Sequence, residues 1–500
     1  MVAVLYRRQT CRKVSSSVGW AGKQTVLFPG CCHVENTADT AQRRVAVHLP
    51  AHWIGIYRRR RPRAAGHRVR ILDARLERLE MAETMARIRE FAPDVLGLTA
   101  VHEAAEKKAV LALAERFKKT GGRAPIVLGG PLVSTSGAAM VASGLIEAAF
   151  LGEGEETFVR YLHILESGGD PAEVPGIFYA RDGCVRQTPT APLVEDVDHL
   201  RVAWDLLQPQ RYFTLSGRSS QSIIKRSHRC VPLFTSRGCP FGCIYCHNIF
   251  GRRFRPRSPE AVVAEMALLA DEYGAEEIEI EDDCFNLDLD RAKAIARLII
   301  ARRLKLHLSF PTGLRADRMD RELVDLLKAA GTYRIFYAVE TAVPRLQRLI
   351  RKNIDFDRAG RMIAYTAASG IMTCGFFMQG FPTETAAEME QTIAYALGSQ
   401  FHQAFFFYVN PFPGTELAER YAVREALDPD PDRLDYFSLK VNLSDVPAAV
   451  IQRLHRLAYR RFYLSPRRLI RLARVVPKNR RTLWAAIIAI LLGFRELDDF

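Results

Sequence analysis

Three cysteines lie close together in the stretch Arg237-Gly-Cys-Pro-Phe-Gly-Cys-Ile-Tyr-Cys-His247. Cys239, Cys243 and Cys246 have the spacing Cys-x3-Cys-x2-Cys, so their thiolates can converge from one short loop. Thiolates suit iron, and a 4Fe–4S cluster takes four ligands. The spacing therefore predicts a cluster with three protein ligands, whose fourth iron is open to a small molecule.

The main alternative for these thiols is a zinc site. Such sites usually combine two Cys-x2-Cys pairs, or one pair with histidines, and His247 directly follows the last cysteine. The remaining cysteines are scattered without a disulfide-like spacing: Cys11, Cys31, Cys32, Cys184, Cys230, Cys284 and Cys374. Because cysteines stay unpaired in a reducing compartment, this usage predicts a cytoplasmic protein.

Alternating strand and helix patterns follow the cysteine loop and must position it. Apolar runs predict strands at residues 233–236, 277–281, 306–310, 333–339, 372–378 and 404–409. Helical patterns lie at residues 259–273, 289–303, 321–330, 357–369 and 385–398. These units predict a partial (β/α)6 TIM-like barrel, in which the working groups belong at the C-terminal ends of the strands.

Polar residues and a glycine follow several of these strands. Asp282 and Asp283 come directly after the second, and adjacent carboxylates can accept hydrogen bonds from an ammonium group or a ribose. Arg315 follows the third strand and can pair with a carboxylate, Glu340 ends the fourth, and Gly380 lies in Gly-Phe-Pro-Thr-Glu after the fifth. Each residue taken alone is also explained as a helix cap or a surface group.

Taken in order, these motifs resemble the landmarks of radical S-adenosylmethionine enzymes of the cobalamin-associated type. The resemblance covers residues 230–420 and includes Tyr245 before the last cysteine, Asp-Asp-x-Phe-Asn, Gly-x-Arg-x-Asp and Val-Glu-Thr. In that family the open iron binds S-adenosylmethionine, which is cleaved to a 5'-deoxyadenosyl radical. The likeness implies these residues for binding it: Tyr245, Asp282, Asp283, Arg315, Glu340 and Gly380. Tyr245 and Gly380 would contact the adenine, Glu340 the ribose, and one aspartate the methionyl amine or ribose.

Residues 69–165 predict a doubly wound, Rossmann-like domain, which makes the whole chain an α/β protein. Apolar strands are expected at residues 69–73, 95–99, 126–130 and 148–152, with a helix at 103–119. Turns at the ends of the last two strands allow close approach of a ligand to the backbone, and a following helix N-terminus favours anions. The turn residues of interest are Gly129, Gly130, Gly152, Glu153 and Gly154.

This segment resembles the cobalamin-binding domain that precedes the barrel in one subgroup of the same family. The resemblance implies cobalamin as a further cofactor, held near the five turn residues. The sequence departs from the family pattern in one respect, because none of its 12 histidines lies in an Asp-x-His-x-x-Gly motif. The usual histidine ligand to cobalt is therefore not expected.

The formal charge of +15 is concentrated near two ends of the chain. Residues 1–75 carry 15 Lys and Arg against 3 Asp and Glu, and residues 451–482 carry 11 against none. The remainder is mildly acidic, which argues against a nucleic acid lying across the barrel. The sequence is expected to divide into an irregular basic segment (1–68), the Rossmann-like domain (69–165), a connector (166–229), the barrel (230–425) and a helical C-terminal region (426–500).

The C-terminal region suggests two arrangements. A helix is expected at residues 448–463, and an apolar run at 483–494 follows Lys478, Arg480 and Arg481. That run could lie on an anionic membrane surface or pack over the barrel mouth. The first residues lack the pattern of a secretory signal, and no apolar run reaches the roughly 20 residues that span a bilayer.

The leading function is a radical S-adenosylmethionine enzyme that uses cobalamin to methylate an unactivated carbon of a small-molecule or lipid-like substrate. It would need an electron donor such as flavodoxin or ferredoxin. One alternative is radical oxidation, cyclisation or rearrangement without cobalamin. A second is a non-catalytic module with zinc in the cysteine loop and basic ends that hold nucleic acid or membrane.

Overall fold

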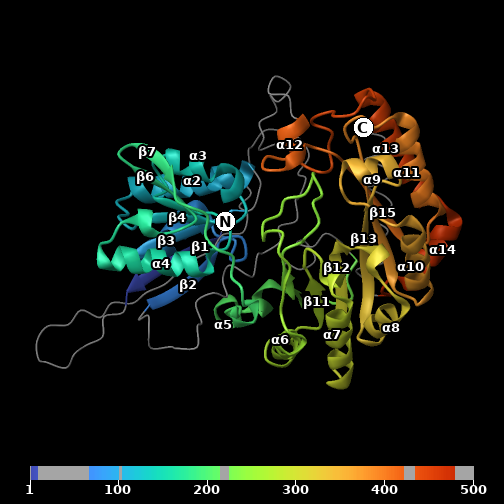
Figure 1. Cartoon of the computed structure of the whole chain (residues 1–500). Coiled ribbons are helices and arrows are strands. Elements are labelled where there is room, and N and C mark those ends of the chain that lie inside the picture. Colours follow the sequence, from blue (N-terminus) through green and yellow to red (C-terminus); the bar gives the residue numbers. More distant parts are fainter. Residues whose placement is uncertain (1, 9–66, 101–103, 214–223, 422–433, 479–500) are drawn as a thin grey trace, which may run out of the picture. The chain divides into compact units, whose positions relative to one another are not determined.

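The computed structural model describes residues 2–8, 67–100, 104–213, 224–421 and 434–478. The chain divides into two compact units, Met1–Tyr212 and Phe213–Phe500. Each unit has its own sheet, with helices packed along it (Figure 1). The predicted apolar run at residues 483–494 lies outside the described part.

The first unit contains a seven-stranded sheet of order β2-β1-β3-β4-β5-β6-β7. Its strands are β1 (Val2–Arg8), β2 (His67–Asp73), β3 (Val95–Thr99), β4 (Ile126–Gly129), β5 (Ala148–Phe150), β6 (Ile177–Arg181) and β7 (Cys184–Gln187). Its long helices are α1 (Met81–Phe91), α2 (Ala104–Lys119), α3 (Val133–Ala142) and α4 (Gly154–Ser167). The neighbours β3, β4 and β5 are parallel, which confirms the α/β class.

The two borders of this unit differ from the predicted ones. β1 lies within the segment predicted to be irregular, and it pairs antiparallel with β2 and β3, so these two strands are not neighbours. β6 and β7, within the predicted connector, form a hairpin, and β6 pairs with β5 and extends the sheet. Edge strands expose unpaired backbone groups, and pairing with the hairpin covers the edge of β5. Much of the supposed connector therefore belongs to the first unit.

The second unit is built on a six-stranded sheet of order β8-β11-β12-β13-β14-β15, in which all neighbours are parallel. The strands are β8 (Cys230–Leu233), β11 (Glu277–Ile280), β12 (His307–Leu314), β13 (Thr332–Glu340), β14 (Met372–Gln379) and β15 (Gln403–Tyr408). The predicted helices are α6 (Pro259–Asp271), α7 (Leu289–Ala301), α8 (Arg321–Ala329), α10 (Phe356–Ala368) and α11 (Ala386–Gly398). The partial barrel is thus confirmed, although β8 begins earlier than predicted and a short α9 (Pro344–Leu349) was missed.

Local signals explain why the five barrel helices begin where they do. The side chain of each N-cap residue accepts a hydrogen bond from the backbone of the first turn, which replaces a missing helical partner. These N-cap residues are Ser258, Asp288, Asp320, Asp355 and Thr385. The caps fix the start of each helix directly after the loop that leaves the preceding strand.

The free edge of β15 is covered by α13 (Ala448–Tyr463), at the bounds predicted from the sequence. Tyr459 Oη lies 3.1 Å from Phe406 N and 3.2 Å from Phe406 O, and Tyr463 Oη lies 3.2 Å from Ala404 N and 3.0 Å from Ala404 O. These hydroxyls satisfy backbone groups that an edge strand would otherwise expose. The open side of the barrel is closed by a helix rather than by another strand.

A last short helix, α14 (Pro466–Val475), follows α13. Its Leu472, Val475 and Val476 just beyond its end pack against buried residues of the barrel interior, which include Phe336 and Met372. In the described part of the chain no helix is long and apolar enough to cross a membrane.

Candidate active site

The cysteine loop leaves β8 at the C-terminal end of the barrel strands, as predicted. Hydrogen bonds tie it to distant segments: Cys239 N donates to Gly251 O at 3.2 Å, and Ile244 N donates to Ile350 O at 3.3 Å. Gly238 has a φ of +82°, and a Cβ there would lie 2.2 Å from Arg253 O. Only glycine fits this position without rearrangement of the loop.

The three loop thiols are not already gathered at the separation that a single zinc ion imposes. Zn–S bonds of about 2.3 Å keep any two sulfur ligands of one ion within about 4.6 Å of each other. Among the described residues, the one group of three possible ligands whose atoms all lie within 4.8 Å is Cys230, Glu277 and Glu279, far from the loop in sequence. The loop thiols nevertheless interact electrostatically with one another.

The electrostatic surroundings of the three thiols are unequal. A hydrogen bond from the Cys284 thiol is the largest influence on Cys239 and lowers its pKa to about 7. Burial raises the pKa of Cys243. Loss of hydration raises that of Cys246 to about 12, although part of its side chain faces solvent. Bound iron would displace these protons, since thiolates are the ligands.

The group Cys230, Glu277 and Glu279 does not resemble an empty metal site, because its charges are already balanced. Lys225 Nζ lies 3.1 Å and Arg334 Nη2 3.0 Å from opposite oxygens of Glu279. Tyr333 Oη donates to Glu277 Oε1 at 2.6 Å. Such a paired and hydrogen-bonded set is how a protein interior accommodates charges. It belongs to the N-terminal end of the barrel strands.

Lys352 lies at the centre of the polar groups beside the loop. Its ammonium is 3.0 Å from Glu340 Oε1 and 3.2 Å from Tyr245 Oη. Burial alone would lower the pKa of Lys352, but Glu340 and Cys243 together raise it above its usual value. The structure thus brings together Tyr245 and Glu340, two predicted site residues, and adds a lysine that no motif indicated. Lys352 carries no local signal because it stands in a turn 12 residues beyond β13.

Glu340 adopts an unusual backbone conformation at the end of β13. Its φ is +70°, and the pairing register with β14 shifts beside it. A positive φ is uncommon for a residue other than glycine, and such strain is found at functional sites. The bend directs the carboxylate toward Lys352 rather than continuing the strand.

Arg315 is engaged within the protein. Its guanidinium binds both oxygens of Asp317 at 3.1 and 2.7 Å and donates to Lys352 O at 2.8 Å. It also lies 4.2 Å from the ring centroid of Phe241, in the cysteine loop. These contacts anchor the loop and the turn that carries Lys352. Because these contacts occupy the N–H donors of Arg315, fewer donors remain for the carboxylate of a ligand than the sequence suggested.

The adjacent Asp282 and Asp283 differ in burial and in their hydrogen bonds. The carboxylate of Asp282 is buried and accepts from Thr235 N at 2.5 Å, Thr235 Oγ1 at 2.6 Å and Ser236 Oγ at 2.5 Å. Asp283 is exposed and accepts from Gly238 N at 3.2 Å. Its pKa is raised to about 6, because nearby protein displaces water from it and because Asp282 adds a like charge. Asp283 is therefore the aspartate with capacity for a ligand.

Gly380 forms a bend after β14 with a φ of +98°. Its backbone N–H donates to Glu384 Oε2 at 2.7 Å, and Phe381 N donates to the same oxygen at 3.0 Å. The Phe381 ring lies 6.0 Å from that of Tyr245. Glu384 thus holds the glycine bend beside the cysteine loop, a role that its place in Gly-Phe-Pro-Thr-Glu did not reveal.

In the first unit, the predicted turn residues lie at the ends of neighbouring strands β4 and β5. Gly130 has a φ of +95°, and a Cβ there would lie 2.3 Å from Thr99 Oγ1. That hydroxyl is buried and has no hydrogen-bond partner in the described residues. Gly152 has open space around its Cα, whereas Glu153 Oε2 accepts from Val194 N at 2.8 Å. The Thr99 hydroxyl and the bare backbone at Gly130 fit a bound polar molecule at this edge.

Two family models match the chain. Residues 233–396 match the radical SAM superfamily, and residues 52–162 match the B12 binding domain.

Similar proteins extend these matches. An uncharacterised methyltransferase of Pyrococcus horikoshii is 32% identical over 414 residues, which cover 81% of this chain and 86% of the relative. The cytidylyl-2-hydroxyethylphosphonate methyltransferase of Streptomyces wedmorensis is 30% identical over 393 residues, 72% of each protein. The methyltransferase TsrM from Kitasatospora setae, solved with cobalamin and a [4Fe-4S] cluster bound, has a TM-score of 0.57 and 22% identity, over 72% of this chain and 70% of that one. This last likeness concerns the fold.

Proposed function

Because this chain belongs to the radical S-adenosylmethionine superfamily, in the subgroup with a B12-binding domain, we propose that it methylates an unactivated carbon of an apolar small molecule. Its cofactors are a 4Fe–4S cluster, S-adenosylmethionine and cobalamin. When bound, they supply a 5'-deoxyadenosyl radical and a transferable methyl group. The observation that carries the proposal is a loop of three separated thiols at the mouth of a parallel barrel, in one chain with a B12-binding domain.

We assign the cluster to Cys239, Cys243 and Cys246, because these three thiols come from one loop at the mouth of the barrel, within the residues that match the radical SAM superfamily. Lys352 supplies positive charge next to Cys243 and favours its thiolate form. The same ammonium orients Tyr245 and Glu340, the residues proposed to bind the adenosine of S-adenosylmethionine.

The remaining site residues take different parts in this proposal. Asp283 has the capacity to bind the methionyl amine, whereas Asp282 and Arg315 position the loop through their protein contacts. Gly380 presents the bend at the adenine side, held by Glu384. In the first unit, Gly130 and Thr99 would face cobalamin.

An aromatic wall supports an apolar substrate. Phe377 and Phe406 face the covering helices, since their rings contact Tyr395 of α11 and Tyr459 of α13. The intervening side chains face the concave side of the sheet, where the half-buried rings of Phe376, Phe405 and Phe407 contact one another. Such a wall has large apolar area but no charge to bind a polar group.

The wall continues toward the cysteine loop. Phe407 contacts Tyr436 and Phe437, whose side chains are exposed, and Tyr436 contacts Phe412, 4.6 Å away between ring centroids. Phe412 in turn contacts His247, next to Cys246. We propose that the substrate lies along these rings with its target carbon near the loop. A reducing compartment and a flavodoxin-like or ferredoxin-like electron donor complete the proposal.

The alternative without cobalamin is disfavoured by the B12-binding match, and the zinc-containing module by the radical SAM match over the cysteine loop. The deciding experiment uses anaerobically purified, iron-reconstituted protein with S-adenosylmethionine, hydroxocobalamin and a strong reductant. Iron, bound corrinoid, 5'-deoxyadenosine and S-adenosylhomocysteine are measured together. We expect Cys239→Ala, Cys243→Ala and Cys246→Ala to lose iron and deoxyadenosine, and the exposed Cys184→Ala in β7 to lose neither.

A neighbouring pair of glycines tests the corrinoid separately. A Cβ at Gly130 would collide with Thr99 Oγ1 and with Ala100 O at 2.4 Å, whereas a Cβ at Gly129 meets nothing within 4 Å. Gly130→Ala should therefore lose corrinoid and S-adenosylhomocysteine but keep its iron, and Gly129→Ala should keep all three. Zinc in the loop without cleavage of S-adenosylmethionine would overturn the proposal, and cleavage without bound corrinoid would leave the simpler radical enzyme.

A further inference from the structure

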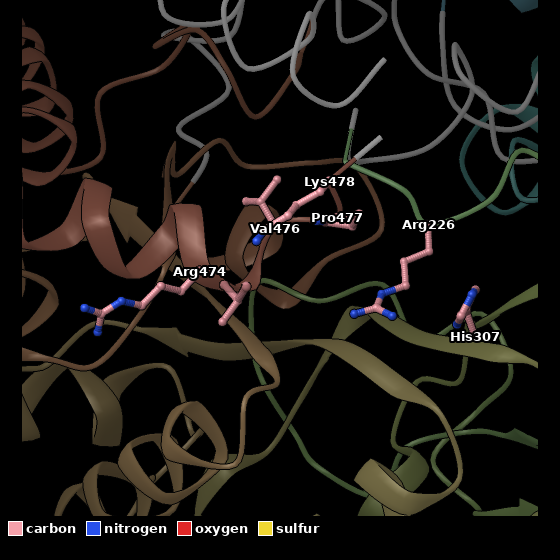
Figure 2. Close-up of a pocket in the computed structure, with 7 residues that line it drawn as sticks. Arg226, His307, Arg474, Val476, Pro477 and Lys478 are labelled. Atoms are coloured by element: carbon pink, nitrogen blue, oxygen red, sulfur yellow. The ribbon is translucent and has the colours of Figure 1, made fainter. Parts of the chain in front are cut away.

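A basic cavity lies at the end of the barrel opposite the cysteine loop. Its volume is about 400 Å³, and the residues that line it are Arg226, His307, Arg474, Val475, Val476, Pro477 and Lys478. Arg226 precedes β8 and His307 begins β12, so the cavity stands at the N-terminal ends of parallel strands. In Figure 2, Arg226 and His307 lie across from Lys478, whereas Arg474 extends away from them along α14.

The positive charge of this cavity is not neutralised within the described residues. Arg226, Arg474 and Lys478 have no ion pair there, and the nearby Glu276 already pairs with Arg229 at 3.5 Å. Burial and the charge of Arg226 lower the pKa of Lys328, at the border of this region. Glu276 also acts on His307, but the cations outnumber this one carboxylate, and a local excess of positive charge attracts an anion.

Exposed apolar side chains gather on α14 and on the end of α13 just before it. Leu464, Leu469 and Ile470 have exposed fractions of 52%, 41% and 55%. Three of the nine large hydrophobic side chains that are exposed in the described chain thus fall within seven residues. Ile470 is turned away from the barrel, because Leu472 lies on the opposite side of the helix and packs against the interior cluster. Leu469, three positions before Leu472, lies at the border between the packed side and the outer side.

Exposed arginines accompany this apolar face. Arg467 and Arg474 lie on α14 beside Ile470, and residues 448–482 include no Asp or Glu. An amphipathic helix with apolar residues outward and arginines at its sides is suited to the interface of an anionic bilayer. Lys478 then leads to Arg480, Arg481 and the apolar run at 483–494, so the same composition continues along the chain.

We propose that α14 and the basic cavity form a docking surface for an anionic phospholipid bilayer. Leu464, Leu469 and Ile470 enter the outer part of the hydrocarbon, and Arg467, Arg474 and Lys478 meet the headgroup phosphates. Arg226 provides charge, and the cavity beside it and His307 provides room, for one headgroup. A second copy of the chain would place like charges against each other, and a nucleic acid would leave the three apolar side chains in water. The proposal stands independently of the methylation chemistry.

The test is co-sedimentation of the full-length holoprotein with vesicles. Vesicles of phosphatidylcholine alone are compared with vesicles that also contain phosphatidylglycerol. We expect binding only to the second kind, weakened by added salt because surface charges are screened. Each cation removed should weaken binding about fivefold, as for a basic residue at a membrane surface. Arg474→Gln/Lys478→Gln, Leu469→Ser/Ile470→Ser and Arg226→Gln are therefore all expected to bind less.

Matched controls separate this surface from charge and hydrophobicity in general. Arg87→Gln/Arg89→Gln removes two exposed arginines from α1, and Leu268→Ser/Ile300→Ser removes two exposed apolar side chains from α6 and α7. Both should bind vesicles like the parent protein, and circular dichroism verifies the fold of each variant. Equal binding by the test variants and the parent would overturn the proposal.

Two further outcomes would also overturn it. Calorimetric binding of inorganic phosphate without vesicle binding would make the cavity a site for soluble anions. Self-association by light scattering that disappears in Leu469→Ser/Ile470→Ser, again without vesicle binding, would make the apolar face an interface between copies.

Discussion

At the scale of single residues, two adjacent carboxylates with the same sequence signature perform different tasks. Asp282 accepts three hydrogen bonds from the start of the loop, whereas Asp283 is exposed. Asp282→Asn would place an amide N–H₂ against donors, which leaves at least one buried donor without an acceptor. We expect a loss of about 1–3 kcal/mol in the free energy of unfolding, measured by chemical denaturation.

The matched control is Asp290→Asn, an exposed position at the start of α7. It should change stability by less than about 0.5 kcal/mol. A stability loss at Asp290 equal to that at Asp282 would contradict the assigned anchoring role.

Glu384 makes stability depend on pH. Its carboxyl is buried, which raises its pKa from 4.5 to about 8, against the lowering effect of the Gly380 and Phe381 N–H groups. Between these pH values the folded state holds a proton that the unfolded state has released, so stability falls as pH rises. The loss is absent below pH 4.5 and complete above about pH 8, with an upper limit of about 5 kcal/mol.

Glu384→Gln keeps an oxygen for both N–H groups and cannot ionise. We expect its midpoint of thermal unfolding to fall less than that of the parent between pH 5 and pH 8.5, values chosen to bracket the titration. Glu390→Gln, exposed on the following helix α11, should follow the parent. Parallel pH profiles for parent and Glu384→Gln would refute the raised pKa.

At the scale of elements, the tyrosines of α13 replace the missing neighbour of β15. Tyr459→Phe/Tyr463→Phe removes both hydroxyls but keeps the rings, so Phe406 N and the backbone of Ala404 lose their partners, while Phe406 O keeps His455 Nε2 at 2.9 Å. We expect about 1 kcal/mol of destabilisation for each hydroxyl and increased aggregation from the exposed edge. Thermal unfolding and light scattering measure the two effects.

Tyr365→Phe is the control for the loss of a tyrosine hydroxyl, since Tyr365 Oη donates only to Asp325. Its contact is on the surface, and little change is expected. The helix α13 was predicted with its correct bounds, but its contact with β15 was not. Helical periodicity locates an element, whereas the partner of its buried face is decided in three dimensions.

At the scale of the whole molecule, the two units have separate hydrophobic cores. Leu113 of α2 is fully buried in the first, and Ile295 of α7 is buried in the second. Leu113→Ala and Ile295→Ala should each cost about 2–5 kcal/mol. In differential scanning calorimetry we expect each variant to shift a different transition, with hydroxocobalamin raising the one that Leu113→Ala lowers. A single transition lowered equally by both would show that the units unfold together.

The sequence by itself determined the cysteine loop, the strands and helices of the barrel, and the family resemblance. It also determined which polar residues follow the C-terminal ends of these strands. These features depend on short spacings and on periodic burial, which neighbouring residues encode directly. The same locality explains why the capped starts of the barrel helices were predicted within a residue. It also explains why the predicted N-terminal border of the first unit was wrong, since β1 and its partner β2 are separated by almost 60 residues of sequence.

Only the tertiary structure decided how the site residues are used. Asp282 is saturated by residues 46 and 47 positions away, and Lys352 reaches Tyr245 across 107 positions, so no local pattern reports either contact. The three consecutive phenylalanines of β15 are equally apolar in sequence. Alternation along the strand puts Phe405 and Phe407 on one side and Phe406 on the other, but only packing decides that Phe406 is the one that contacts α13. Long-range packing decides which partner a polar side chain bonds and which side of a strand faces the interior. The residue type alone cannot decide it, because residues of the same type lie in different surroundings.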